Sequence, residues 1–288
     1  MASRAVGLIA NASKRGAAEL VPQIATALRK RGIEVRCDPQ TAPLLADAVQ
    51  STRTELAASC ELLLVLGGDG TLLETAHELE GNAPPVFGIN VGTLGFLTSV
   101  GVAAWEKAVD CIAKGECRVE ERTLLCVELR VGGESVLVRY ALNDAVISRG
   151  QRSQLIRLNV RVDGAGLSQY NADGLIVATP TGSTAYALSA GGPVMTPDSG
   201  VFVIAPICPH VLTMRPVVVS DQSRIEITPI GEAPDVLLSI DGQHHPPVTS
   251  DAVIVLSKAD RRVRLATLPD TTFFEVLRQK LKWSGSAV

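Results

Sequence analysis

The chain has 288 residues, of which 46% are hydrophobic and 20% charged, so it can bury a sizeable core and is not a disordered protein. Its net charge is -3 and it has no basic stripe, which argues against a nucleic-acid-binding surface. The longest apolar run, near residues 201–208, contains Pro206 and is much shorter than the roughly 20 apolar residues that cross a bilayer, so we expect no membrane association.

The cysteines and the start of the chain suggest a cytoplasmic protein. None of the six cysteines has the spacing of a zinc or redox site, and several lie in apolar runs. Reduced core thiols in a cytosolic protein are therefore the favoured interpretation. The apolar stretch at residues 5–10 is too short for a signal peptide and predicts a first strand instead.

The first 115 residues alternate strands with helices. Short apolar runs predict strands at residues 6–10, 33–36, 62–66 and 86–89, and helical periodicity predicts helices at 17–31, 44–58, 72–80 and 102–114. Such alternation indicates a mostly parallel, doubly wound, Rossmann-like sheet. We therefore predict an α/β domain over residues 1–117.

The pattern changes after residue 117. Apolar and polar residues alternate over 125–131, Gly132 and Gly133 turn the chain, and alternation resumes at 136–140. Further short strands follow to residue 266, which predicts a β-sandwich-like domain over 118–266. Residues 271–283 predict a helix, and we expect this C-terminal segment, 267–288, to pack back on the α/β domain.

A Gly-Gly-Asp-Gly-Thr sequence at residues 67–71 follows a predicted strand and precedes a predicted helix. Glycines remove side chains from the loop, so backbone N–H groups and the start of the helix, expected at residues 71–72, can bind phosphate oxygens. Asp69 would repel phosphate, but it is useful if it accepts a proton from an attacking hydroxyl. The alternative is a plain turn with an aspartate cap. The strand before and the helix after favour function.

A second motif spans residues 171–186 and reads Asn-Ala-Asp-Gly, a strand, then Thr-Pro-Thr-Gly-Ser-Thr-Ala-Tyr. Ser183 or Thr184 could cap the helix that follows. The small side chains of that helix would let a flat ligand approach the backbone. The alternative is a capped helix that fills a gap between sheets. The density of Gly, Ser, Thr and Ala favours a ligand site.

Two smaller polar groups remain. Asn143 and Asp144 interrupt an apolar strand, so they face a cleft or mark a bulge or strand end, with equal support from the pattern. The Asp241-Gly242-Gln243 sequence predicts a hairpin turn. The four histidines have no metal-ligand spacing, so we expect no structural metal.

The order and spacing of these motifs resemble the bacterial NAD kinase family. The matching segments are residues 67–71, 88–98, 143–144, 173–189, 191–193, 209–210 and 215–216. The Gly-Gly-Asp-Gly-Thr element alone also marks diacylglycerol and sphingosine kinases. The long Thr-Pro-Thr-Gly-Ser-Thr-Ala-Tyr element is far more specific.

The resemblance implies an activity and a set of residues. It implies phosphorylation of the 2'-hydroxyl of the adenosine ribose of NAD by ATP, with a divalent cation, usually Mg²⁺, and homodimers or homotetramers formed through the second domain. It implies Asp69 as proton acceptor and a donor phosphate loop of Gly67, Gly68, Gly70 and Thr71. The NAD contacts that it implies are Asp69, Gly70, Asn143, Asp144, Asp173, Thr184, Ala185, Tyr186, Ala187, Leu188, Ser189 and Gln243. Asn171 departs from relatives that carry Arg, which would remove a charge contact to the dinucleotide phosphates.

Three rival functions share part of the pattern. A lipid kinase of the diacylglycerol type shares the first motif but would need a basic or apolar surface facing a membrane. A dinucleotide sensor would have no need of a carboxylate among phosphates, so Asp69 argues against it. A phosphofructokinase-like enzyme is disfavoured by the resemblance of the second motif to NAD kinases.

Overall fold

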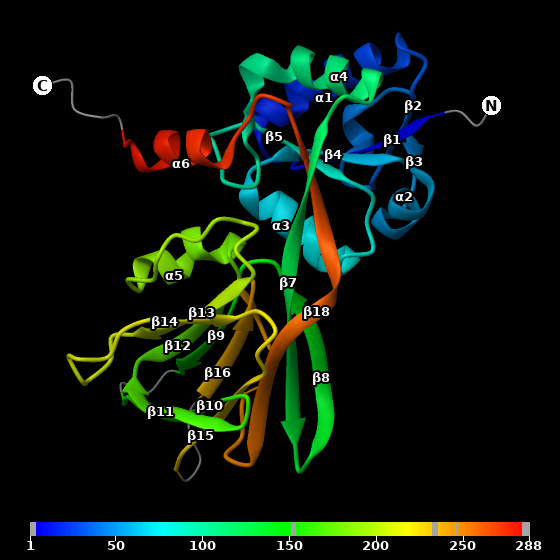
Figure 1. Ribbon diagram of the computed structural model, residues 1–288. Coiled ribbons are helices and arrows are strands. Elements are labelled where there is room, and N and C mark those ends of the chain that lie inside the picture. The colour runs from blue at the N-terminus through cyan, green and yellow to red at the C-terminus, as the bar shows by residue number, and fades with distance from the viewer. Residues whose placement is uncertain (1–3, 151–153, 232–235, 246, 284–288) are drawn as a thin grey trace, which may run out of the picture. The chain divides into compact units, whose positions relative to one another are not determined.

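The computed structural model describes residues 4–150, 154–231, 236–245 and 247–283 (Figure 1). The chain forms two compact units, one of Met1–Glu121 with Val263–Val288 and the other of Arg122–Arg262. The boundaries expected at residues 118 and 267 each lie four positions from these. Over the described ranges, no helix has both the length and the apolar character needed to cross a membrane.

The first unit contains the predicted parallel sheet. Its strands are β1 (Ala5–Ala10), β2 (Glu34–Cys37), β3 (Val49–Gln50), β4 (Leu62–Gly67), β5 (Val86–Asn90) and β6 (Val100–Gly101). They run in the order β3-β2-β1-β4-β5, every pair parallel, and β6 also pairs with β5. The last part of β18 (Ala252–Thr267) lies parallel to β5. Because β1 and β4 are central and wholly buried, their sequences are continuous apolar runs.

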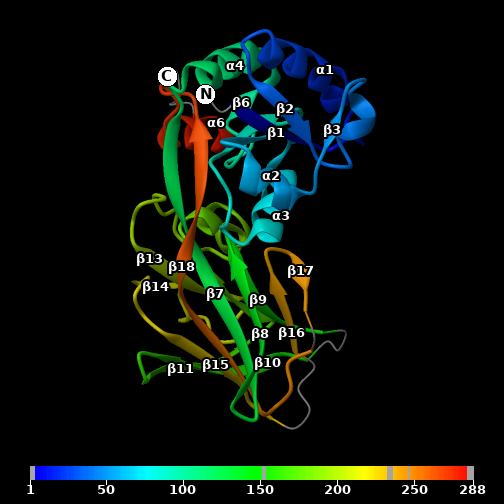
Figure 2. The ribbon, with the colours of Figure 1, turned by 90° about the vertical axis from the view of Figure 1, so that its right-hand side faces the viewer.

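Helices cover both faces of this sheet. Figures 1 and 2 show α1 (Arg15–Arg29) and α4 (Trp105–Lys114) on one face and α2 (Arg53–Ser59) and α3 (Asp69–Leu79) on the other. Helix α1 buries Leu20, Ile24 and Leu28, the residues whose four-residue spacing predicted it. The C-terminal helix α6 (Phe273–Leu281) belongs to the same unit. Its Lys280 ammonium lies 5.7 Å from the centre of the Phe96 ring.

The helix predicted over residues 44–58 was largely wrong. The structure has a 3-10 turn, Ala42–Leu44, then the short strand β3, and only then α2. The helix begins late because Thr52 and Glu55 form a reciprocal cap, with Glu55 N–H to Thr52 Oγ1 at 3.2 Å and Thr52 N–H to Glu55 Oε2 at 2.7 Å. Residues 49–50 instead extend the edge of the sheet.

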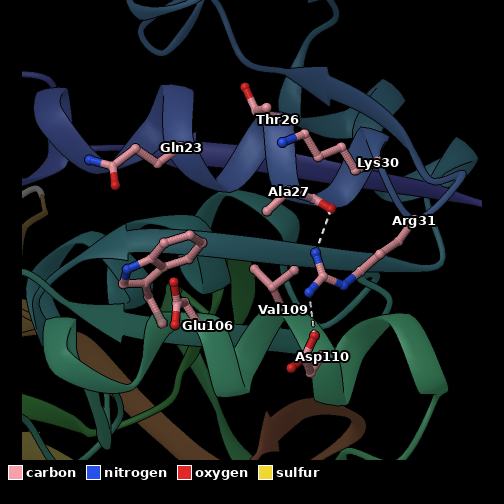
Figure 3. Close-up of a pocket in the computed structure, with 9 residues that line it drawn as sticks. Gln23, Thr26, Ala27, Lys30, Arg31, Glu106, Val109 and Asp110 are labelled. Atoms are coloured by element: carbon pink, nitrogen blue, oxygen red, sulfur yellow. Dashed lines mark hydrogen bonds and ion pairs between the residues drawn. The ribbon is translucent and has the colours of Figure 1, made fainter.

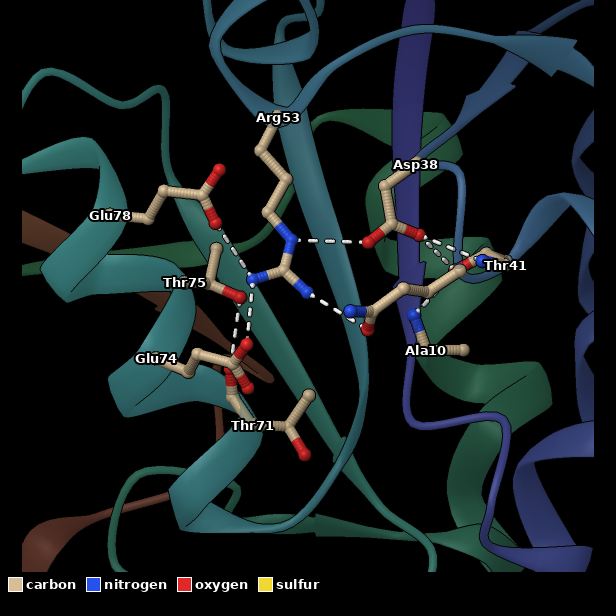
Figure 4. A network of polar contacts seen from close by, with 9 residues as sticks. Ala10, Asp38, Thr41, Arg53, Thr71, Glu74, Thr75 and Glu78 are labelled. Carbon is tan, nitrogen blue, oxygen red and sulfur yellow. Dashed lines mark hydrogen bonds and ion pairs between the residues drawn. The ribbon is translucent and has the colours of Figure 1, made fainter.

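A buried ion-pair network ties α2 and α3 to the loop that follows β2 (Figure 4). Arg53 is 6% exposed and its Nε lies 3.1 Å from Oδ2 of Asp38, which is 1% exposed. Its Nη1 lies 2.9 Å from Glu78 and 3.4 Å from Glu74, both on α3. The other Asp38 oxygen accepts the Thr41 backbone N–H at 3.0 Å. Buried charges need such partners, so this network restrains α3 from its outer side.

The second unit is a two-sheet β-sandwich, as predicted. One sheet is antiparallel in the order β14 (Val217–Ser220), β13 (Val201–Ile207), β12 (Gly174–Ala178), β9 (Asp144–Arg149), β16 (Val236–Ile240), β17 (Gln243–His244). The other contains β11 (Ala165–Ala172), β10 (Ile156–Val162), β15 (Ile225–Pro229), β18, β7 (Arg118–Val131) and β8 (Glu134–Ala141). Alternate residues of both sheets, such as Leu125, Val127 and Ile147, form one core.

Candidate active site

The turn from β4 into α3 is unusually tight. A Cβ on Gly67 would overlap the Thr71 side chain, so only glycine permits this approach. Gly68 is the extended residue before the helix, and α3 begins at Asp69, two to three residues before the predicted start at 71–72. The Gly68 carbonyl accepts the Thr71 N–H at 3.0 Å, which closes the first turn. Asp69 therefore lies on rigid backbone at the positive end of a helix.

Four donors hold the Asp69 carboxylate. Oδ2 accepts the backbone N–H of Phe96 at 2.8 Å. Oδ1 accepts the backbone N–H groups of Leu97 at 3.1 Å and Thr98 at 3.0 Å, and the Thr98 hydroxyl at 2.9 Å. A Cβ on Gly95 would overlap this carboxylate, so glycine is needed for the loop to wrap around it. The side chain is half-buried and its orientation is set by the 95–98 loop.

Thr98 and Asn90 form a second layer behind Asp69 that sequence reasoning missed. The Asn90 amide donates to Thr98 Oγ1 at 2.7 Å, and its carbonyl oxygen accepts the Gly92 N–H at 2.7 Å. Thr98 is fully buried and Asn90 is 3% exposed. The available signal was a polar residue that ends the buried strand β5, because such a group must find a partner inside the protein.

In the second unit, Asp241 fixes the backbone of residues 142–144. Its carboxylate accepts the N–H groups of Leu142 at 2.7 Å, Asn143 at 2.8 Å and Asp144 at 3.1 Å. The predicted hairpin turn is confirmed, with φ of 48° at Asp241 and 79° at Gly242 between β16 and β17. The turn prediction alone did not reveal that its aspartate also anchors the Asn143-Asp144 pair.

Thr179 holds the same segment from the other side. Its hydroxyl donates to the Leu142 carbonyl at 2.5 Å and accepts the Gly182 N–H at 3.1 Å, while its own N–H donates to the Asn143 carbonyl at 2.9 Å. A Cβ on Gly182 would overlap the Asn143 carbonyl. The Asn143-Asp144 pair and the Thr-Pro-Thr-Gly motif, predicted separately, are therefore one piece of structure.

Asp144 opens β9 and is 5% exposed. Burial raises the pKa of its carboxyl group to about 7, and the neighbouring negative charge of Asp241 adds to the effect. Asp144 is therefore divided between its neutral and ionised forms near pH 7. Asn143 and Asp144 lie at the start of a strand rather than within one, and their role as ligand contacts stays a prediction.

The helix predicted after Thr184 is short and has no side-chain cap. Helix α5 (Tyr186–Ser189) follows a 3-10 turn, η3 (Thr181–Thr184). Ser183 is buried inside that turn, where its hydroxyl donates to the Pro180 carbonyl at 2.6 Å and accepts the Met195 N–H at 3.0 Å. The predicted cap at Ser183 or Thr184 was wrong because both hydroxyls serve the preceding turn.

Asp173 lies at the opposite end of β12 from Thr179, about 20 Å away over six residues of extended backbone. Its carboxylate lies 2.8 Å from Arg149 Nε. A pocket of about 310 Å³ is lined by Ser148, Arg149, Gly150, Asp173, Tyr186 and Ile207. Arg149 supplies a cation there that sequence reasoning did not consider.

The remaining predicted residues differ in accessibility. Gly70, Tyr186, Ser189 and Gln243 are exposed, whereas Thr184, Ala185 and Leu188 are half-buried. Ala187 is buried against Ile176 and Val203 on the outer face of the six-stranded sheet, so only its main chain is available to a ligand. A separate pocket of about 380 Å³ between α1 and α4 contains none of the predicted site residues (Figure 3).

Comparison with known proteins follows the same division of the chain. Residues 6–117 match the family model of the ATP-NAD kinase N-terminal domain, and residues 142–268 match that of the ATP-NAD kinase C-terminal domain. The NAD kinase of Solibacter usitatus is 40% identical over 281 residues, which is 97% of this chain and 98% of that protein. The NAD kinase of Thiobacillus denitrificans is 41% identical over 280 residues, 96% of each.

Two solved structures are similar throughout. A yeast NADH kinase complexed with NADH has a TM-score of 0.90 at 25% identity, over 98% of this chain and 89% of that one. An NAD kinase from Archaeoglobus fulgidus in complex with ATP has a TM-score of 0.77 at 27% identity, over 96% of this chain and 98% of that one.

Proposed function

The chain belongs to the ATP-NAD kinase family, and on that basis we propose that it transfers the terminal phosphoryl group of ATP to the 2'-hydroxyl of the adenosine ribose of NAD, giving NADP. The observation that carries the proposal is the Asp69 carboxylate, which four donors fix at the start of α3. The similar kinases whose structures contain NADH and ATP support a nicotinamide dinucleotide as acceptor and ATP as donor.

Asp69 is the proton acceptor in this reaction. A carboxylate offers about four acceptor positions, two on each oxygen. Three donors occupy Oδ1, whereas Oδ2 accepts one hydrogen bond, from Phe96. Oδ2 is therefore the oxygen that receives the ribose hydroxyl proton as the phosphoryl group is transferred. Help of this kind typically contributes roughly 10² to 10⁴ in rate.

The donor phosphates bind at the turn of Gly67, Gly68, Gly70 and Thr71. Gly70 is exposed and no atom lies within 4 Å of the position that a Cβ would occupy, so a phosphate can approach the first-turn amides of α3. A divalent cation such as Mg²⁺, bound with ATP, would neutralise part of the phosphate charge. The described residues contain no group of three His, Cys, Asp or Glu side chains that could hold a metal ion.

The NAD contacts that we propose in the first unit are Asp69 and Gly70, and those in the second unit begin with Asn143 and Asp144. The rigid segment of Asn143 and Asp144 supports this role, because Asp241 and Thr179 hold its backbone from both sides. The other contacts that we propose are Asp173, Thr184, Ala185, Tyr186, the main chain of Ala187, Leu188, Ser189 and Gln243. Asn171 stands where some relatives carry Arg. In this chain Arg149, paired with Asp173, provides positive charge for a dinucleotide phosphate instead.

The chain forms a homodimer or homotetramer through the second unit and acts in the cytoplasm. Leu212, 88% exposed, and Val211, 45% exposed, lie together in that unit, and burying such a pair favours self-association. Light scattering coupled to size exclusion measures the assembly, and a monomer at micromolar concentration would rule it out.

A coupled assay tests the reaction. Purified protein is incubated with NAD, ATP and Mg²⁺, and the NADP formed is measured with an NADP-specific dehydrogenase. Asp69→Asn should lose most turnover and keep its fold and most NAD affinity. Asp110→Asn, on the exposed side of α4, is the matched control and should be fully active. Equal loss of binding and turnover would assign Asp69 a structural role.

The same assay separates the rival functions. NAD binding without NADP formation from any donor indicates a sensor. Activity that requires lipid vesicles indicates a lipid kinase. Replacement of ATP by polyphosphate identifies the preferred donor.

A further inference from the structure

Lys14 reaches the donor phosphate turn from a different loop. Strands β1 and β4 are parallel neighbours, with Ala10 opposite Leu66. The loops that follow them therefore leave the same edge of the sheet side by side. The Asn11 N–H donates to the Leu66 carbonyl at 3.0 Å, which extends the pairing one residue into the loops.

The backbone at Lys14 is fixed by a compact turn. The Asn11 side chain accepts the Ser13 N–H at 3.2 Å, and the Asn11 carbonyl accepts the Lys14 N–H at 3.0 Å. Lys14 is then the residue before α1, and its carbonyl accepts the Ala17 N–H at 2.9 Å. The start point of the side chain is therefore well determined.

The Lys14 ammonium lies against Gly68. Its Nζ is 3.1 Å from the position that a Cβ on Gly68 would occupy. Gly68 has φ of -137°, an extended conformation that any residue can adopt. The absence of a side chain there therefore matters for space rather than for backbone conformation, since it admits the ammonium to the turn.

The charge of Lys14 has no counter-ion among the described residues. The nearby carboxylate, Asp69, is engaged by the loop of residues 96–98 instead. No ion pair or side-chain hydrogen bond is formed by Lys14 within the part of the chain that the structure describes, although the side chain is half-buried. A partly desolvated cation beside main-chain N–H groups attracts an anion with several oxygens.

We propose that Lys14 binds the phosphate chain of the nucleoside triphosphate donor above the Gly67-Gly68 turn. This inference deepens the kinase function and rests on it. Lys14 supplies a positive point charge from the loop after β1, while Asp69, at the start of α3, accepts the proton of the hydroxyl acceptor. The first unit therefore offers a positive side chain, Lys14, to the triphosphate donor and a negative one, Asp69, to the hydroxyl of the acceptor.

Three variants test the assignment. Lys14→Met removes the charge at nearly constant length, Lys14→Arg restores a cation, and Lys30→Met removes a lysine at the far end of α1 as the matched control. Isothermal titration measures binding of ATP and of inorganic tripolyphosphate without NAD. Steady-state kinetics then measure KM for ATP and for NAD separately. Thermal unfolding confirms that each variant is folded.

Lys14→Met should weaken ATP and tripolyphosphate binding by about 10- to 100-fold, the usual effect of losing a hydrogen bond to a charged group. Its KM for NAD should stay within about twofold, Lys14→Arg should recover most affinity, and Lys30→Met should match the wild type. Unchanged triphosphate affinity in Lys14→Met overturns the inference, as does wild-type protein that binds no tripolyphosphate or an equal effect on NAD.

The binding arm separates this inference from the proposed function. If triphosphate binding depends on Lys14 but the protein makes no NADP, the proposed kinase activity is refuted and the role of Lys14 is supported. If Lys14→Met forms NADP at the wild-type rate at limiting ATP, the kinase activity is supported and the role of Lys14 is refuted.

Discussion

Replacement of Thr98 by valine isolates the layer that orients Asp69. The side chain is fully buried, and valine has nearly the same shape, so the change removes a hydroxyl without opening a cavity. Two hydrogen bonds disappear, one donated to Asp69 Oδ1 and one accepted from the Asn90 amide. The three backbone N–H groups on Asp69 remain, so the carboxylate is loosened rather than released.

The magnitude follows from these contacts. A hydrogen bond to a charged group contributes about 1.5–3 kcal/mol, and a buried donor left unpaired costs about 1–3 kcal/mol. Because the two effects share one hydroxyl and are not additive, we expect the free energy of unfolding to fall by about 3 kcal/mol. A looser proton acceptor should lower kcat about tenfold, which is less than the loss expected for Asp69→Asn.

Urea denaturation and steady-state kinetics measure the two effects. Thr98→Ser keeps the hydroxyl and is the matched control, so it should retain kcat and lose only the stability of one methyl group. KM for NAD and ATP should change little in either variant. If Thr98→Val loses stability but keeps kcat within twofold of Thr98→Ser, Thr98 does not orient Asp69 for catalysis and the reasoning fails.

Three further changes probe the rest of the structure. Arg53→Met should lower the free energy of unfolding by about 3–5 kcal/mol in urea, because it strands the buried charge of Asp38; a loss below 1 kcal/mol would mean that Asp38 is hydrated. Asp144, with its pKa raised to about 7, keeps its proton in the folded state when the unfolded chain has lost it, so stability should fall by up to about 4 kcal/mol as pH rises from about 4 to 7. Asp144→Asn should flatten that dependence, and an identical pH profile in the variant contradicts the assignment. Asp241→Asn weakens the acceptor for three backbone N–H groups and should raise KM for NAD about tenfold with a smaller change in kcat, whereas a selective fall in kcat would argue against this role.

Local sequence pattern was sufficient for much of the fold. The apolar runs of β1 and β4 identified a buried parallel sheet, because strands covered on both faces are apolar at every position. The strict alternation at residues 125–131 identified a sandwich strand with one face in the core. Gly67 and Gly68 marked the strand-to-helix turn. A side chain at such a turn would clash with residues only a few positions away, so the need for glycine is visible in the local sequence.

Local pattern failed where a nearby partner competed with it. The stretch 44–58 has helical composition, but the Thr52 cap starts the helix late and the sheet edge takes residues 49–50. Ser183 is a good cap by type, yet its hydroxyl is used by Pro180 and Met195. In each case a hydrogen bond outweighed a propensity that is worth only a few tenths of a kcal/mol.

The site itself was decided by tertiary structure. The sequence alone singled out Asp69 from its setting between a strand and a helix, but its donors lie 27 to 29 residues further along the chain. The sequence predicted Asp241 only as part of a hairpin turn, yet its carboxylate accepts hydrogen bonds from backbone N–H groups 97 to 99 residues earlier in the chain. Lys14, between the strand predicted at 6–10 and the helix predicted at 17–31, was not singled out by the sequence, and its side chain reaches Gly68 only because β1 pairs with β4. Periodicity and glycine report on the chain within one element, whereas the partner of a polar side chain depends on which strands become neighbours and in what register.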